Sequence, residues 1–161
     1  FLILLIKNMK EIHKKRLQNN FTWTPADKRL DNIGQPVPPR PVDKRKPKLW
    51  LTNAIKNNDE TLEAYDIFLV NSSGMSLKSV TVDSGGWYYD ADELIESSQK
   101  DKIEYKNIND GEAIKVFIYH PLYDGDETTW LSLKIEMVND IIDFSTSYNQ
   151  NTKRVDKEVV I

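Results

Sequence analysis

The clearest pattern of apolar and polar positions lies in residues 65–82, YDIFLVNSSGMSLKSVTV. Its first half alternates as a strand does and is rich in β-branched and aromatic residues. Asn71 can hydrogen-bond its own backbone and Gly74 can adopt positive φ, so the residues between the two halves suit a tight turn. The sequence therefore predicts a β-hairpin over residues 65–82, with a bulge near Lys78 and Ser79 where the alternation breaks.

Further strands are predicted downstream. Residues 103–108 end at Asn109-Asp110-Gly111, which is a strong hairpin signal, and residues 113–119 follow with Ile114 and Val116 facing the core. Residues 130–138 alternate most cleanly, and a turn at Asn139-Asp140 leads into residues 141–148. A last strand is predicted near the C-terminus, through Val159.

Two further segments have a less regular pattern of apolar and polar residues. Asp83-Ser84-Gly85-Gly86 predicts a turn that leads into the aromatic residues Trp87 and Tyr88. Residues 91–98 follow Asp90 and predict a short helix across one end of a sheet, with a strand as the competing interpretation.

Together these segments make seven to nine short strands separated by regular turn signals. Such spacing favours an all-β fold, an antiparallel immunoglobulin-like β-sandwich, because a parallel sheet needs long helices between its strands. The succession of a strand, an Asn-Ser-Gly turn, a strand and a later Asp-Gly-Glu turn before an apolar strand is similar to that of immunoglobulin-like bacterial domains. The likeness spans residues 65–119 and concerns the fold alone.

The first 48 residues have a different character from the rest. Residues 8–19 predict a short N-terminal helix, and residues 34–48 contain five of the seven prolines, which predicts an extended connector. We therefore divide the chain into a basic arm at residues 1–48 and a β-sandwich domain at residues 49–161. The apolar residues 1–6 are too few to span a membrane and follow no basic segment, so we expect no membrane contact and a cytoplasmic location.

The net charge of −3 hides a division between these two parts. Residues 1–48 contain 12 Lys and Arg against 4 Asp and Glu, hence +8, whereas residues 49–161 contain 10 against 21, hence −11. We expect the arm to lie along an acidic face of its own domain or of a neighbouring copy, anchored by Phe21 and Trp23, with Arg45, Lys46 and Lys48 supplying charge. A dimer that exchanges arms through the proline-rich connector is one version of this hypothesis.

Catalytic and metal-binding motifs are weak throughout the chain. The absence of cysteine excludes thiolate chemistry, and His13 and His120 have no ligand spacing around them. Asp124, Asp126 and Glu127 form a weak calcium candidate, but so short a run supplies too few oxygens and is better explained as a solvated turn. We therefore predict a protein that is not an enzyme and needs no cofactor.

Aromatic residues supply the remaining candidate site. Phe117 and Tyr119 fall on the face opposite the aliphatic stripe of their strand, and with Trp87 and Tyr88 they suit a surface patch for protein or carbohydrate recognition. The alternative is that a second layer of the fold buries them.

The predicted function is a non-enzymatic binding or assembly module acting through protein–protein contacts, either with another protein or with a second copy. One alternative is a nucleic-acid-associated accessory protein that contacts phosphates through the basic arm, although the acidic domain opposes this. Another is a small carbohydrate-binding or calcium-binding β-sandwich.

Overall fold

The computed structural model describes residues 15–18, 21–23, 46–57, 64–98, 102–119, 128–148 and 158–161. These residues form strands, turns and extended segments, with no helix among them. The strands are β1 (Arg16–Gln18), β2 (Leu49–Asn57), β3 (Ala64–Asn71), β4 (Leu77–Asp90), β5 (Glu93–Ser98), β6 (Ile103–Ile108), β7 (Glu112–Tyr119), β8 (Thr128–Glu136), β9 (Ile141–Tyr148) and β10 (Glu158–Val159). The all-β prediction is confirmed.

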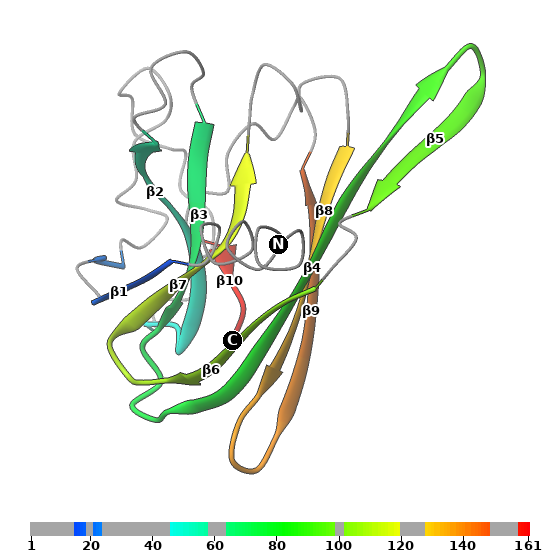
Figure 1. The fold of residues 1–161 in the computed structure, drawn as a ribbon. Coiled ribbons are helices and arrows are strands. Elements are labelled where there is room, and N and C mark those ends of the chain that lie inside the picture. Colours follow the sequence, from blue (N-terminus) through cyan, green and yellow to red (C-terminus); the bar gives the residue numbers. More distant parts are fainter. Residues whose placement is uncertain are drawn as a thin grey trace, which may run out of the picture.

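The strands form two antiparallel sheets that face each other (Figure 1). Sheet I has the order β1-β7-β3-β2-β10, and sheet II has the order β5-β4-β8-β9 with β6 also paired to β4. β4 is the longest strand: one edge pairs with β8, and the other pairs first with β6 and then with β5. Beyond the end of β8, β4 and β5 continue together as a two-stranded ribbon that projects from the sandwich (Figure 1).

The hairpin predicted over residues 65–82 does not form. Both strands exist, but β3 pairs with β2 and β7 in sheet I, whereas β4 belongs to sheet II. Residues 72–76 therefore carry the chain from one sheet to the other, and Gly74 has the positive φ of 79° that the turn was expected to need. Local turn chemistry was predicted correctly, but the partners of the two strands were not.

The turn at residues 109–111 differs from its prediction in the same way. β6 pairs with β4 and β7 pairs with β3, so the predicted Asn-Asp-Gly hairpin is a second crossing between the sheets. The Glu112 amide donates to the Asn109 carbonyl at 3.1 Å and Gly111 has a φ of 83°, so the turn itself is tight.

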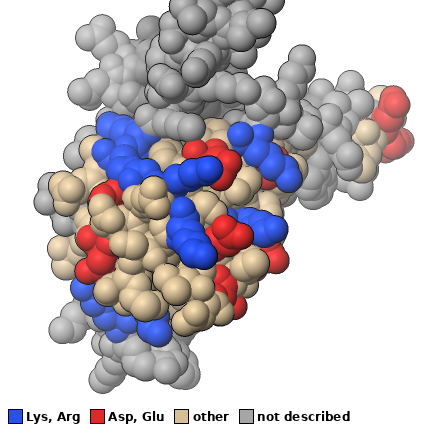
Figure 2. All heavy atoms as spheres, turned by 60° about the horizontal axis from the view of Figure 1, so that its bottom comes forward, with Lys and Arg blue, Asp and Glu red and all other residues tan. Residues whose placement is uncertain are grey.

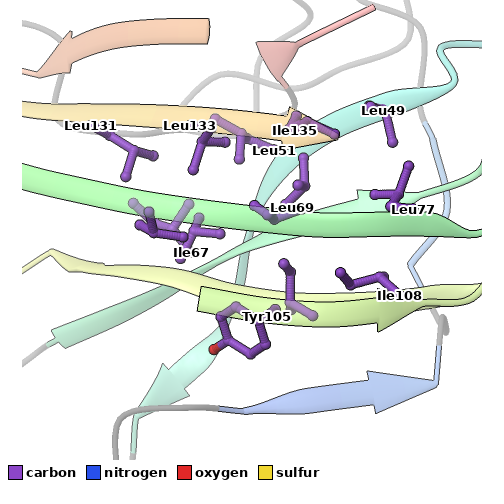
Figure 3. Packing of buried hydrophobic residues seen from close by; sticks show 14 residues of the cluster. Leu49, Leu51, Ile67, Leu69, Leu77, Tyr105, Ile108, Leu131, Leu133 and Ile135 are labelled. Carbon is purple, nitrogen blue, oxygen red and sulfur yellow. The ribbon is translucent and has the colours of Figure 1, made fainter. Parts of the chain in front are cut away.

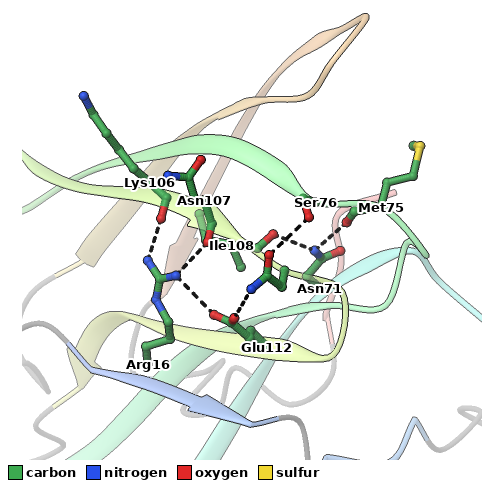
Figure 4. A network of polar contacts seen from close by, with 9 residues as sticks. Arg16, Asn71, Met75, Ser76, Lys106, Asn107, Ile108 and Glu112 are labelled. Atoms are coloured by element: carbon green, nitrogen blue, oxygen red, sulfur yellow. Dashed lines mark hydrogen bonds and ion pairs between the residues drawn. The ribbon is translucent and has the colours of Figure 1, made fainter.

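The two crossings lie side by side and are hydrogen-bonded to each other through Asn71, which is fully buried (Figure 4). Its side-chain amide donates to the carbonyls of Met75 at 2.9 Å and Ile108 at 3.2 Å. Its side-chain oxygen accepts from the Ser73 amide and hydroxyl, and its backbone carbonyl accepts from the Gly111 amide. A polar side chain at the end of the core is thereby satisfied on every side.

The core fills the space between the sheets (Figure 3). In most strands alternate residues point into it, as the pleat of a strand favours. Sheet I contributes Leu49, Leu51, Ile67, Leu69, Ile114 and Val116, and sheet II contributes Leu77, Val80, Val82, Tyr105, Ile108, Leu131, Leu133 and Ile135.

The break in alternation at Lys78 and Ser79 is real but causes no register shift. Leu77 pairs with Ile108, and Val80 pairs with Tyr105, and all four residues are buried in the core. Between these pairs, residues 78–79 of β4 and 106–107 of β6 are not among the buried residues, and Asn107 has a positive φ of 54°. Because β4 and β6 both lose their alternation between the same two pairs, neither strand has an extra residue, and the predicted bulge is wrong.

Two turns are genuine hairpins. Ala91 and Asp92 both have positive φ, 47° and 67°, between the paired residues Asp90 and Glu93, which is the two-residue turn that matches strand twist. Residues 93–98 are therefore a strand, and the predicted helix at 91–98 is wrong. The turn at residues 137–140 between β8 and β9 is confirmed, since β8 and β9 pair on either side of it.

Two other predictions of local structure are corrected. Gly85 and Gly86 lie inside β4, paired with Trp130 and Thr129, instead of in a turn. In the predicted N-terminal helix at 8–19, residues 16–18 form strand β1, and residues 8–14 and 19 lie outside the described part. No helix that could cross a membrane is found among the described residues.

The C-terminal residues bind the opposite edge of the sandwich. β10 pairs with β2, and the Ile161 carbonyl accepts the Lys48 amide at 2.9 Å. The Thr146 hydroxyl of β9 donates to the Glu158 carboxylate of β10 at 2.9 Å, so this edge is also linked from one sheet to the other.

Replacing Asn71 with Ala should lower the free energy of unfolding by about 2–4 kcal/mol, because several buried polar groups lose their partner at once. Asn139→Ala, at an exposed turn position, is the matched control and should change it by less than about 0.5 kcal/mol. Urea denaturation of both variants measures the difference. Equal effects of the two substitutions would contradict the role assigned to Asn71.

Candidate functional site

The outer faces of the two sheets differ in polarity. On sheet II the outward positions of β4 and β8 include the polar residues Ser79, Thr81, Asp83, Ser132, Lys134 and Glu136, and also the half-buried Trp130 of β8. On sheet I the outward positions include a second apolar cluster formed by Trp50, Phe68, Val70 and Ala113, all buried. We call this cluster, together with the edge of β7, the docking surface.

Residues of the arm cover the docking surface. The Phe21 ring lies 5.7 Å from that of Phe68, and the Trp23 ring meets that of Trp50 edge-on with 5.3 Å between centroids. Leu17 packs against the same cluster. Aromatic pairs at these separations are attractive beyond the apolar area that they bury.

Main-chain pairing holds the same segment at the sheet edge. β1 extends sheet I by pairing Arg16, Leu17 and Gln18 with residues 114, 113 and 112 of β7. The Lys115 amide then donates to the Lys15 carbonyl at 2.8 Å. An edge strand that would otherwise offer unpaired amides and carbonyls is therefore capped along this stretch.

Tyr105 connects this edge to the other sheet. Its hydroxyl donates to the Lys115 carbonyl at 2.6 Å and accepts from the Lys15 amide at 3.1 Å, so β6, β7 and the arm meet at one oxygen. Burial raises the pKa of Tyr105, and the Lys15 hydrogen bond and the charge of Arg16 lower it to a smaller extent. The phenol is therefore held in its neutral form.

Arg16 binds the junction of the two sheets (Figure 4). Its guanidinium donates to the carbonyls of Lys106 and Asn107, each at 2.7 Å, where β6 departs from regular alternation. It also pairs with the Glu112 carboxylate at 3.2 Å, and that carboxylate accepts from the Asn109 side chain at 2.8 Å. The planar guanidinium suits several acceptors held in fixed directions.

A buried ion pair lies on the same outer face. The Lys115 ammonium is 3.4 Å from Asp66 Oδ1, and the two side chains are only 10% and 8% exposed. That oxygen makes no hydrogen bond within the described residues, so the ammonium is the group that compensates its charge. Lys115 is paired in register with Phe68, which places the ion pair beside the aromatic contacts.

The predicted arm residues fall into two groups. Phe21 and Trp23 lie on the docking surface of their own domain, and their contacts there are aromatic. Lys46 and Lys48 are exposed just before β2, and Arg45 lies outside the described residues. The end of the sandwich that carries the crossings has basic and acidic side chains interspersed over it (Figure 2).

The residues of the predicted aromatic patch are divided between the two sheets. Trp87 and Tyr88 belong to β4 in sheet II, and Phe117 and Tyr119 belong to β7 in sheet I; only the backbone of Trp87, Tyr88 and Tyr119 is described. The prediction that Phe117 faces away from the aliphatic stripe is wrong. A register shift at Val116, between the pairs with Phe68 and Ile67, turns Phe117 toward the core cluster.

The calcium candidate, Asp124, Asp126 and Glu127, lies outside the described residues, as do both histidines. Within the described ranges, no group of three or more His, Asp or Glu side chains is placed to hold a metal ion.

Several residues of this site were not found from the sequence. Tyr105 and Glu112 sit in predicted strands or turns without any motif, and Arg16 was placed on a helix. Asp66 and Lys115 gave the one available signal, since both are charged residues on otherwise apolar strands. A charge in such a position is rarely buried without a partner, so the two residues could have been predicted to pair.

Comparison with known proteins yields no relative: no family model, no curated protein and no solved structure matches the chain.

Lys115→Met should lower the free energy of unfolding by about 3–5 kcal/mol, because it leaves the buried Asp66 carboxylate uncompensated. The double variant Asp66→Leu/Lys115→Met should recover most of that loss, since both desolvated charges are then removed. Urea denaturation of the single and double variants tests this. A double variant less stable than the Lys115→Met chain would contradict it.

Because of Tyr105, we expect the folded chain to lose stability at alkaline pH. Its pKa is raised in the folded chain, so its contribution is complete below the unfolded value of about 10 and is lost as the pH rises through the folded pKa. The unfolding free energy of the wild-type chain should therefore fall more steeply above about pH 10 than that of Tyr105→Phe. If the unfolding free energies of the two chains fall in parallel as the pH rises, Tyr105 does not couple folding to pH.

Proposed function

We propose that the protein is a non-enzymatic binding and assembly module that works through the docking surface on sheet I. The observation that carries this proposal is the seating of residues 15–18 and 21–23 there, as an added edge strand followed by two aromatic anchors. Strand addition is a recurrent mode of peptide recognition, in which main-chain hydrogen bonds supply affinity and side-chain contacts supply specificity. The arm then acts as a tethered ligand of its own domain.

The chemistry of the surface supports recognition of a particular segment. Phe68 and Trp50 receive aromatic rings, Ala113 and Val70 leave room for an aliphatic side chain, and Glu112 pairs with a guanidinium. A matching ligand is thus an extended peptide with an arginine and a leucine followed by two aromatic residues. The polar outer face of sheet II has no comparable set of apolar positions among those described on β4 and β8.

We further propose that the sandwich is immunoglobulin-like. In that fold, strands A, B, E and D form one sheet in this order, and strands C, F and G form the other. The order β2-β3-β7 in sheet I matches A-B-E and the order β4-β8-β9 in sheet II matches C-F-G, with β3 to β4 and β7 to β8 passing between sheets as B to C and E to F do. β1 lies beside β7, where D lies beside E, but it precedes β2 in the chain and so does not correspond to strand D. β5, β6 and β10 are additions to that plan.

Binding of nucleic acid through the arm has less support. Arg16 is engaged by Glu112 and by two carbonyls, and the aromatic residues of the arm face its own domain. Among the basic residues of the arm that the structure describes, Lys15, Arg16, Lys46 and Lys48 are exposed.

The test is to make the arm a separate ligand of the otherwise complete protein. A protease site placed in residues 31–36 is cleaved, and a fluorescent peptide of residues 10–24 is added to displace the severed arm. The peptide should bind saturably, and Phe21→Ala or Trp23→Ala in the peptide should weaken binding at least about tenfold, because each removes a partly buried ring that packs on the docking surface.

A scrambled peptide of identical charge is the control, and the titration is repeated at 0.05 and 0.5 M NaCl. Binding carried by the rings should change little with salt. Equal binding of the scrambled peptide, or a steep loss with salt that duplex DNA reproduces by competition, would overturn the proposal in favour of charge-driven contact with phosphates.

A further inference from the structure

We infer that the docking surface of one copy receives the arm of a second copy, so that the protein forms a dimer by mutual exchange of arms. This inference rests on the proposed function and names the partner of the same surface. The segment that is seen to fit the surface is the chain's own, with Arg16, Leu17, Phe21 and Trp23 all in contact. A second copy offers that segment unchanged.

The positions of the linker ends favour exchange. The linker (residues 24–45) begins after Trp23 and ends before Lys46, which lies four residues ahead of Trp50. Because the rings of Trp23 and Trp50 are 5.3 Å apart, an arm docked on its own domain brings the two linker ends to within roughly 20 Å of each other. Docking within one chain thus requires that these 22 residues return to within that distance, which is far less than their extended length.

The composition of the linker opposes such a return. It contains five of the chain's seven prolines, at positions 25, 36, 38, 39 and 41. Proline-rich segments favour extended conformations of about 3.1 Å per residue, so this linker can span up to roughly 70 Å. Stiffness of this kind lowers the effective concentration of the arm at its own domain and leaves it available to another.

Exchange also satisfies the symmetry of a closed dimer. Each copy gives one arm and receives one, so both β7 edges are capped and both aromatic clusters are covered with the contacts already described. The two contacts are related by a twofold axis, and no surface is left to propagate a chain of molecules.

An engineered disulfide between the arm and the docking surface distinguishes docking within a chain from exchange. Because the wild-type chain has no cysteine, the introduced thiols are the only ones that can pair. Leu17 and Ala113 are directly paired across β1 and β7, and opposed residues of an antiparallel pair lie at the separation that a disulfide requires. The full-length Leu17→Cys/Ala113→Cys variant is oxidised at 0.5 mM and examined without reductant. Exchange predicts a covalent dimer linked by two bonds.

The other outcomes each have a definite meaning. A disulfide within a monomer overturns exchange but leaves the docking of the arm, and hence the proposed function, intact. No disulfide, in a chain whose circular dichroism matches the wild type, overturns both. Should the variant misfold, the same question is put to separate Leu17→Cys and Ala113→Cys chains, mixed at equal concentration: a disulfide between the two kinds of chain supports exchange, and its absence contradicts it.

The contribution of the linker is tested in a chain without engineered cysteines. Replacing the prolines at 36, 38, 39 and 41 with Gly and Ser keeps the length and makes the linker flexible. Light scattering over a concentration series should show the wild-type dimer and a dissociation constant at least about tenfold higher for the flexible variant. A wild-type chain that stays monomeric up to 0.5 mM would overturn the inference.

Discussion

The buried side chain of Asn71 is the constraint on which the rest of the structure depends. It sits where the chain leaves sheet I for sheet II, and its amide reaches the carbonyl at the end of β6, where the chain leaves sheet II for sheet I. The two crossings are thereby held against each other, and the strands that follow them are directed into opposite sheets. Without this bond the end of the core would expose several unpaired main-chain groups, which a packed interior tolerates poorly. The same junction supplies the carbonyls that Arg16 binds, so the arm is positioned by the fold of the crossings.

The difference between the outer faces connects this fold to its proposed use. The described outward side chains of β4 and β8 in sheet II are polar except for that of Trp130, whereas sheet I carries Trp50 and Phe68 outward and buries them under the arm. A domain that keeps large aromatic residues on the outside of a sheet depends on a covering segment, whether from its own chain or from another. Tyr105, which bonds both the arm and β7, makes that cover part of the same hydrogen-bond system as the core. Binding through this surface is therefore tied to the stability of the sandwich.

The sequence predicted which residues form strands far better than which strands pair. Alternation placed β3, β6, β7, β8 and β9 correctly, because it reports one local property, the face on which apolar side chains lie. Pairing depends on contacts distant in sequence: the turns at Gly74 and Gly111 have the expected conformation, yet each leads to the opposite sheet. The orientation of Phe117 was missed for a related reason, since one extra residue at Val116 inverts the pattern after it. Phe21 and Trp23 were identified as anchors from their aromatic character alone, whereas the polar residues that fix the arm, Arg16, Glu112 and Tyr105, belong to no local motif.

The central claim is that the two predicted hairpins are crossings between sheets and that the arm is seated beside them. Cross-strand nuclear Overhauser effects in the full-length protein test it most directly. The structure predicts contacts between the backbone protons of Val80 and Tyr105, across β4 and β6, and between those of Leu17 and Ala113, across β1 and β7. Contacts between Lys106 and Ile114, as a hairpin at Asn109-Asp110-Gly111 requires, together with none from Leu17 to β7, would contradict it.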